Sequence, residues 1–229
     1  MSPFLTIPVL SEEALLSGEV SRVVLDPPQE TPHNADLFFE AICQQYPDLR
    51  VEQNAQGQVS LMPPEGNESS YRNTELVSQL SRWAKIDGRG VCFGTSTAFY
   101  LADGSKLGPD AAWVSIARLQ QFPREQRRRF LRLTPEFVIE LKSPTDSWPV
   151  LQRKMLDWRR NGVELGWLID ADKRVVLIYT LGTDEPTVLE NADYITGSGP
   201  VAGFRLEMKH VWRGLDFESA NLSDFRNTR

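Results

Sequence analysis

The sequence predicts an α/β domain in which a mixed β-sheet is flanked by helices. Apolar, strand-like runs span residues 135–144, 165–170 and 175–180, and an amphipathic helix lies between the first and second of these runs. The order strand, helix, strand, strand is typical of a sheet with mixed strand directions. Because no internal repeat, low-complexity tract or linker is present, we expect a single domain over residues 1–229, with its core over about residues 36–215 and an N-terminal arm over residues 1–35.

Composition and charge narrow the function classes. Hydrophobic residues make up 41% of the chain and charged residues 24%, which is typical of a soluble globular protein with a sizeable core. The net charge of -6 argues against a protein whose main role is non-specific binding to the phosphate backbone of nucleic acids. It does not exclude a nuclease, because a metal site supplies local positive charge.

The N-terminus and the cysteines predict a cytoplasmic protein. The first ten residues are apolar, but they contain two prolines and no basic segment, which argues against a signal peptide. No run approaches the roughly 18 to 20 apolar residues of a membrane span, so no membrane partner is expected. Cys43 and Cys92 form no CxxC arrangement, and we interpret them as free, buried thiols of a reducing compartment.

The N-terminal half predicts an arm, a helix, a hairpin and a longer helix. Residues 34–46 carry apolar side chains at helical spacing, and a proline follows them. Residues 49–53 and 58–62 predict a hairpin around a polar turn. The longer helix begins near Asn67 or Ser69, either of which can cap its free N–H groups, and ends at Gly88.

Shorter elements follow. Residues 91–95, 97–101 and 108–114 read as extended, and residues 116–130 predict a helix broken by a proline. The helix that begins at Ser147 carries apolar side chains on one side and ends at Gly162. At the end of the chain, residues 203–215 predict an edge strand and a short helix.

Two charges interrupt the apolar strand at residues 135–144. Glu140 and Lys142 project to one face of this strand together with Val138, because side chains two residues apart point the same way. The opposite face carries Phe137, Ile139 and Leu141. A solvated ion pair on an edge strand would give the same spacing, since E-x-K is short and common.

Asp110 adds a second carboxylate. It follows a proline at the start of an apolar strand, so its side chain and that of Glu140 are expected to converge from neighbouring strands. Two carboxylates suit a hard divalent cation such as Mg2+, and the backbone carbonyl of Leu141 is a further oxygen. A nearby Lys142 would orient a bound water or stabilise charge on a phosphodiester oxygen, which favours a hydrolytic site over the solvated pair.

An ordered series of motifs resembles the Uma-two family, restriction-endonuclease-like proteins that are abundant in cyanobacteria. The resemblance covers about residues 36–215 and rests on six segments: Arg72-Asn73 and residues 96–99, 108–114, 135–146, 151–155 and 161–170. It implies a restriction-endonuclease-like fold, in which a mixed β-sheet core is flanked by helices, here with an N-terminal arm and a hairpin.

The resemblance also implies a PD-(D/E)xK site. Asp110 takes the PD position, Glu140 and Lys142 take the E-x-K positions, and Gln152 lies in the helix that follows. Gln152 is otherwise a helix-surface glutamine. Many family members carry another residue in place of Lys142, so the lysine of this chain favours a competent site.

Such cores often add an acidic residue from the first core helix. Glu68 is the candidate for this position and Glu75 is the runner-up. The implied metal ligands are therefore Glu68, Asp110, Glu140 and the carbonyl of Leu141. The implied cofactor is Mg2+, with Mn2+ as a substitute.

The function implied by the resemblance is a metal-dependent endonuclease that hydrolyses DNA phosphodiester bonds. One alternative is a catalytically inactive nuclease-fold module that binds nucleic acid or protein. Another is a homodimer in which two copies share the DNA-binding surface.

The remaining motifs are less specific. The basic run at residues 127–129, with Arg124 and Arg132, is either a contact for a DNA backbone or a solvated helix face, which charge runs usually are. His33 and His210 lack neighbouring zinc ligands, and no phosphate-binding loop or G-x-S-x-G elbow is present. The tryptophans near the predicted site in sequence are more typical of a core.

Overall fold

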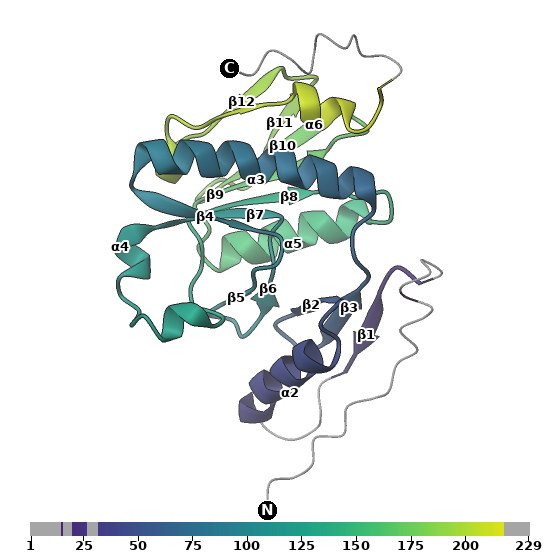
Figure 1. Cartoon of the computed structure of the whole chain (residues 1–229), viewed down its shortest axis with the longest axis vertical. Helices are drawn as coiled ribbons and strands as arrows, with labels where there is room; N and C mark the ends of the chain where they lie inside the picture. Colours follow the sequence, from purple (N-terminus) through teal and green to yellow (C-terminus); the bar gives the residue numbers. More distant parts are fainter. Residues whose placement is uncertain (1–14, 16–19, 27–31, 218–229) are drawn as a thin grey trace, which may run out of the picture.

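A six-stranded mixed sheet forms the centre of the molecule (Figure 1). The computed structural model describes residue 15, residues 20–26 and residues 32–217. The strand order is β11 (Thr187–Glu190), β10 (Val175–Thr180), β9 (Leu165–Asp170), β8 (Phe137–Leu141), β7 (Ala111–Ser115) and β4 (Gly90–Gly94). Strands β8 and β9 are parallel and every other neighbouring pair in this sheet is antiparallel. The predicted mixed sheet is therefore confirmed.

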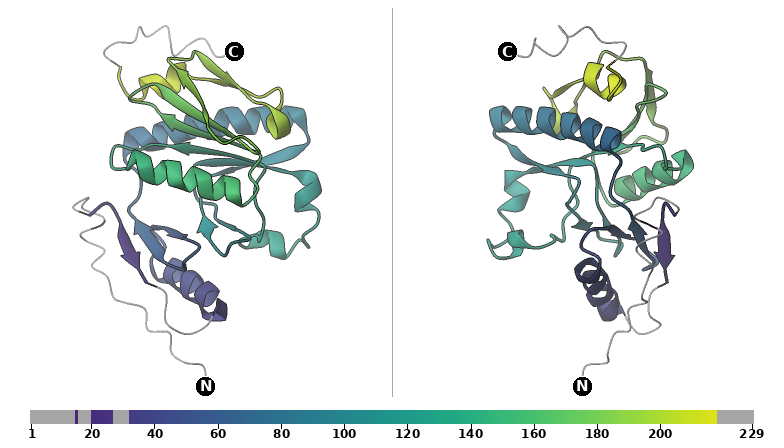
Figure 2. Two further views of the ribbon diagram at one scale, coloured as in Figure 1. Left: turned by 180° about the vertical axis from the view of Figure 1, so that it is seen from behind. Right: turned by 45° about the vertical axis from the view of Figure 1, so that its right-hand side comes forward.

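Two long helices cover opposite faces of this sheet (Figures 1 and 2). Helix α3 (Asn67–Asp87) packs on one face through Leu76, Leu80 and Ala84, and α5 (Trp148–Arg160) packs on the other. The residues of β8 divide between the two cores as the sequence predicts. Phe137, Ile139 and Leu141 face α3, whereas Val138 faces α5. Helix α3 begins after Gly66, which makes no side-chain cap, so the expected cap by Asn67 or Ser69 is wrong.

A second, smaller sheet lies beside the core and is covered by helix α2 (Pro32–Gln45). Its strand order is β1 (Val23–Leu25), β3 (Val59–Met62), β2 (Arg50–Gln53), β6 (Lys106–Leu107) and β5 (Phe99–Tyr100). The predicted helix and hairpin are confirmed. The predicted arm holds one described strand, β1, and the rest of residues 1–31 lies largely outside the described residues.

Several short elements depart from the sequence-based expectations. The predicted strand at residues 108–114 begins only at Ala111, because Gly108 and Pro109 are irregular and Asp110 lies in a bend before β7. The predicted broken helix consists of α4 (Ile116–Leu119) and a 3-10 turn, η1 (Gln126–Arg128).

The C-terminal strand also departs from expectation, because it does not extend the central sheet. Among the described strands, β13 (Arg205–Glu207) pairs with β12 (Tyr194–Thr196) alone, in a separate hairpin-like sheet, and α6 (Lys209–Arg213) follows it. Between these two strands lies a 3-10 turn, η2 (Gly199–Val201). Across the described ranges, no helix has the length and apolar character needed to cross a membrane.

Candidate active site

The two predicted carboxylates meet where β7 begins and β8 ends. Ala111 lies opposite Ile139 in the antiparallel β7–β8 pair, so the residues just outside that pair, Asp110 and Glu140, become neighbours on the α5 face. The backbone N–H of Asp110 donates to the Ile139 carbonyl at 3.0 Å, and the N–H of Leu141 donates to Asp110 Oδ2 at 2.6 Å. Both carboxylates are buried. The predicted convergence of Asp110 and Glu140 is therefore present.

Helix α5 supplies both hydrogen-bond partners of the Glu140 carboxylate. Trp158 Nε1 donates to Glu140 Oε1 at 2.7 Å, and Lys154 Nζ donates to Glu140 Oε2 at 2.9 Å. Burial raises the pKa of Glu140 to about 7, because the charged form loses its hydration, and the Asp110 carboxylate adds to this effect. Lys154 opposes the rise. The Glu140 carboxyl group therefore gains or loses its proton near neutral pH.

Lys154 makes three polar contacts at the bottom of the site. Besides Glu140, its ammonium reaches Glu52 Oε1 at 2.7 Å and the Gly108 carbonyl at 2.8 Å. Burial alone would lower the pKa of Lys154, but the carboxylates of Glu140 and Glu52 outweigh burial and raise it. Lys154 is therefore a fixed, charged group between the central sheet and β2.

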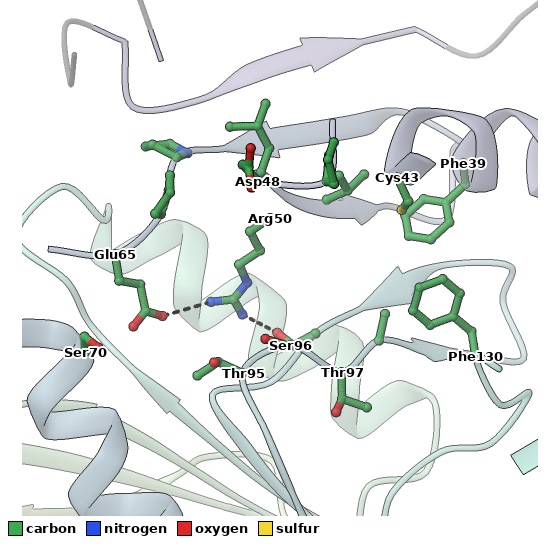
Figure 3. A pocket seen from close by; sticks show the side chains of 17 residues that line it. Phe39, Cys43, Asp48, Arg50, Glu65, Ser70, Thr95, Ser96, Thr97 and Phe130 are labelled. Atoms are coloured by element: carbon green, nitrogen blue, oxygen red, sulfur yellow. Dashed lines mark hydrogen bonds and ion pairs between the residues drawn. The ribbon is translucent and has the colours of Figure 1, made fainter. Parts of the chain in front are cut away.

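Arg50, on β2, neutralises the opposite side of the same cluster. Its guanidinium lies 2.9 Å from Asp110 Oδ1, 3.2 Å from Glu52 Oε1 and 3.6 Å from Glu65 Oε1, and it also donates to the Gly108 carbonyl. Figure 3 shows a neighbouring cavity, lined by both residues, in which the Arg50 side chain is directed toward Glu65. The Arg50 guanidinium thus lies between the carboxylates of Asp110 and Glu65, a position that also suits a metal cation.

Three other predicted site residues make their polar contacts outside this cluster. Lys142 Nζ donates to the Ser143 carbonyl at 3.2 Å, and the Gln152 side chain hydrogen-bonds that of Tyr179 on β10. The Glu68 carboxylate is 45% exposed and forms an ion pair with Arg72 at 3.1 Å. None of these three side chains forms a hydrogen bond or ion pair with Asp110 or Glu140, and their roles stay predictions.

A cavity of about 570 Å3 opens over the carboxylates. Its lining brings together residues from both sheets and from α3 and α5, namely Arg50, Glu52, Glu65, Glu68, Asn73, Asp110, Glu140, Leu141 and Lys154. Lys142, Gln152 and the runner-up Glu75 do not line this cavity. Glu65, which precedes α3, shares Arg50 with Asp110 and therefore lies closer to the centre of the site than Glu68 does.

Sequence reasoning missed four residues of the cluster, namely Arg50, Glu52, Glu65 and Lys154. For Lys154 a signal was present. Lys154 follows Leu151 by three positions and precedes Trp158 by four, so it lies on the buried side of an amphipathic helix, where a charge needs a partner. For Arg50 and Glu52 no local signal existed, because their partners come from a different sheet.

The oxygen atoms around the cavity fit a hard divalent cation. Mg2+ prefers oxygen ligands, keeps several waters and often binds one or two carboxylates together with substrate phosphates. Asp110 and Glu140 provide the two carboxylates. The side-chain carbonyl of Asn73 is buried and, within the part of the chain that the structure describes, has no hydrogen-bond partner. Its amide donates to Glu65 Oε2 at 2.7 Å, so the free oxygen belongs to the same cluster.

Binding of a metal ion at this site would require a change in the existing ion pairs. Among the described residues, no three His, Cys, Asp or Glu side chains form a ready-made metal cluster. A cation at Asp110 would also compete with Arg50 for Oδ1. The donor set therefore suits a two-carboxylate site that Arg50 must partly vacate.

The two cysteines lie outside the cluster. Cys43 and Cys92 are free, as expected, but both are half-buried instead of buried. Burial raises the pKa of the Cys43 thiol to about 11 and that of Cys92 to about 12. Because the thiolate is the nucleophile, neither thiol is suited to nucleophilic catalysis at neutral pH.

Comparisons with known proteins agree with the fold. The Uma2 family model, whose description reads "Putative restriction endonuclease", matches residues 37–209. A crystal structure described as that of "a putative nuclease belonging to DUF820 from Anabaena variabilis" is 23% identical, covers 71% of this chain and 89% of its own, and has a TM-score of 0.60.

The other comparisons add no functional information. A DrdV–DNA complex solved by cryo-electron microscopy is 19% identical over 54% of this chain and 10% of its own, with a TM-score of 0.35, which is too low to bear on fold or function. None of the curated proteins compared with the chain matches it.

Proposed function

The chain belongs to the Uma2 family of restriction-endonuclease-like proteins, and we propose that it is a metal-dependent endonuclease that hydrolyses phosphodiester bonds of DNA. Family membership and the fold neighbour support a nuclease role. The observation that carries the proposal is the meeting of Asp110 and Glu140 at the junction of β7 and β8, beside a lysine ammonium and beneath an open cavity.

Mg2+ is the proposed cofactor, with Mn2+ as its substitute. Nucleases of this kind generally use divalent metal ions. The Asp110 and Glu140 carboxylates would hold the ion, together with the Leu141 carbonyl, which faces Asp110 because the N–H of the same residue does. Glu68, which lines the same cavity, is a further proposed ligand. Such an ion activates water and neutralises charge on a phosphate oxygen.

The reaction is a hydrolysis that needs no redox partner. The oxygen of a water molecule forms a bond to phosphorus while the bond between phosphorus and one ester oxygen breaks. One proton of the water leaves with the formation of the new bond, and one proton is taken up by the departing oxygen, which becomes a hydroxyl group. Lysine and arginine side chains contribute by stabilising the charge on the phosphate oxygens. Lys142 is the family-implied candidate for this task.

Plasmid nicking tests the proposal. Supercoiled DNA is incubated with the native chain, with Asp110→Asn and with Glu140→Gln, in Mg2+, in Mn2+ and in EDTA. Glu185→Gln, an exposed acid on a distant loop, serves as the matched control. We expect nicking by the native chain and the control in metal only, and a loss of at least about 100-fold in both site variants. Equal nicking by all four proteins would contradict the site assignment.

A non-catalytic binding module is the second candidate. Arg50 and Lys154 already neutralise the buried carboxylates, so the cluster is electrostatically satisfied by the protein itself. A module of this kind would bind DNA or protein with the same affinity in Mn2+ and in EDTA. Calorimetry that detects a Mn2+ site in the native chain and none in Asp110→Asn would count against it.

A further inference from the structure

We propose that Lys154, rather than Lys142, supplies the lysine of this active site, and that Glu52 is the residue that positions it. The inference rests on the proposed nuclease function and names a different residue for one of its roles. It also makes the small sheet part of the site, because Glu52 comes from β2.

The first observation is that the Lys154 ammonium is fixed in place. An ammonium group carries three N–H donors, and Lys154 has an acceptor for each: Glu140 Oε2 at 2.9 Å, Glu52 Oε1 at 2.7 Å and the Gly108 carbonyl at 2.8 Å. The side chain is only 12% exposed. The contacts with the two carboxylates hold the ammonium in place even when its third N–H changes partner.

The second observation is the contrasting position of Lys142. Its Cα follows the last residue of β8, and the i, i+2 spacing does place it on the Glu140 side of the strand. Spacing fixes only the direction of Cβ, however, and the four-carbon stem of a lysine is flexible. The Lys142 ammonium lies at the carbonyl of the next residue, Ser143, and the side chain does not line the cavity over Asp110 and Glu140.

Glu52 accounts for the placement of Lys154. One oxygen, Oε1, accepts from Lys154 Nζ at 2.7 Å, from an Arg50 guanidinium nitrogen at 3.2 Å and from the Gly108 N–H at 3.3 Å. The carboxylate is therefore shared by the two cations of the site and by the bend that carries Asp110. Without Glu52, the ammonium would keep its contact with Glu140 but lose the contact that holds it toward β2.

The chemistry requires a cation beside the carboxylate that binds the metal. Lys154 meets this requirement. It reaches Glu140 from α5, whereas Asp110 lies beside Glu140 just before β7, and all three residues line one cavity. From there, an N–H can turn from the Gly108 carbonyl to a phosphate oxygen as negative charge grows on it. The lysine acts as a point charge, which tolerates this change of partner.

The competing reading is that Lys154 is only a structural counter-ion. Removing the ammonium would then lower stability, since two buried carboxylates would lose their partner. It would reduce nicking only to the extent that the protein is unfolded. A catalytic role for Lys154 predicts instead a fall in kcat in a folded protein, with unchanged DNA affinity and partial rescue by arginine.

The experiment compares matched variants at the two lysines. Lys154→Met, Lys154→Arg, Lys142→Met, Lys142→Arg and Glu52→Gln are assayed for nicking in Mn2+ under steady-state conditions, and each is melted in the same buffer. We expect Lys142→Met to stay within about threefold of the native kcat. Lys154→Met should lose about 100-fold or more in kcat, with KM within about threefold of the native value. The kcat of Lys154→Arg should be about tenfold higher than that of Lys154→Met. Glu52→Gln should lose about tenfold in kcat.

Each other outcome overturns the inference in a recognisable way. A large loss in Lys142→Met with little loss in Lys154→Met returns the role to Lys142. If Lys154→Met does not fold, the charge-preserving pair decides, because the inference requires a larger loss in Lys154→Arg than in Lys142→Arg. If the native chain does not nick DNA with any of the divalent metals tested, the proposed function and this inference fall together. If the native chain is active but the Lys142 and Lys154 variants have equal activity, only the lysine assignment falls.

Discussion

The ammonium of Lys154 lies 2.9 Å from the Glu140 carboxylate, although the two residues belong to different layers of the fold. Glu140 is the penultimate residue of β8 in the central sheet, and Lys154 lies in the middle of α5, which packs on that sheet. This contact joins the helix to the buried carboxylate at the place where a catalytic lysine is expected. It also makes the local chemistry of Glu140 depend on α5 and, through Glu52, on the small sheet.

The affinity for Mn2+ should depend on pH. Burial raises the pKa of Glu140 to about 7, so below that pH the carboxyl group is protonated and a metal ion must displace the proton. Mn2+ affinity should therefore increase by up to about tenfold per pH unit until about pH 7 and level off above it. Calorimetry between about pH 5.5 and 8 measures this dependence. Glu185→Gln, which removes an exposed acid outside the site, is the control and should keep the same pH dependence. An affinity in the native chain that does not change with pH would contradict the assignment.

Replacing Arg50 should strengthen metal binding. The Arg50 guanidinium is 2.9 Å from Asp110 Oδ1 and competes with any cation for that oxygen. In Arg50→Gln we expect a Mn2+ affinity about tenfold higher, equivalent to about 1.4 kcal/mol. Arg205→Gln, which removes an exposed ion pair with Glu207, is the control and should leave the affinity unchanged. A weaker Mn2+ affinity in Arg50→Gln would show that Arg50 supports the metal site instead of competing for it.

Removing the indole donor of Trp158 should destabilise the protein. Trp158→Phe deletes the N–H that donates to Glu140 Oε1 at 2.7 Å and leaves a buried oxygen without that partner, which costs about 1–3 kcal/mol. Trp167→Phe is a close control, because Trp167 is equally buried and its Nε1 has no hydrogen-bond partner among the described residues. Urea unfolding measures both free energies. Equal losses would mean that the hydrogen bond to Glu140 contributes nothing beyond packing.

Replacing the basic run at residues 127–129 should show whether these arginines contact DNA or form a solvated surface. These three arginines are exposed and line a cavity of about 850 Å3 that shares Ser96, Thr97 and Ala98 with the cavity of Figure 3. If the run binds a DNA backbone, replacing all three with glutamine should weaken duplex binding and reduce the salt slope by about 0.9 for each lost phosphate contact.

The control for that triple variant replaces three other exposed basic residues: Arg160, Lys173 and Arg205. Fluorescence anisotropy at several salt concentrations gives the affinity and the slope for both proteins. Identical behaviour of the two triple variants would identify the run as a solvated surface.

Elements with a strong hydrophobic period were predictable from the sequence. The two faces of β8 and the apolar stripe of α5 follow from alternation and from helical spacing, and both agree with the packing. Short elements were not predictable in the same way. β5 and β6 are two-residue strands; β6 pairs with β2 and β5 pairs with β6, and no local pattern records such partners.

The site shows the same division. Asp110 and Glu140 were predictable because Asp110 directly precedes one strongly apolar strand and Glu140 lies near the end of another, and these two strands pair in the sheet. The roles of Arg50 and Glu52 depend on how a separate sheet docks against the bend at Gly108, which is a tertiary relationship. The direction of the Lys142 side chain depends on rotamers beyond Cβ, which strand spacing does not determine.

The central claim is that Asp110 and Glu140 hold a divalent metal ion, and diffraction from crystals grown with Mn2+ tests it most directly. Mn2+ scatters anomalously, so its position can be located independently of the protein model. The account predicts an anomalous peak bound by both carboxylates at about 2.1 Å, with the Arg50 guanidinium displaced from Asp110 Oδ1. Crystals with Mn2+ bound elsewhere, or with the Arg50–Asp110 ion pair intact and no peak between the two carboxylates, would contradict it.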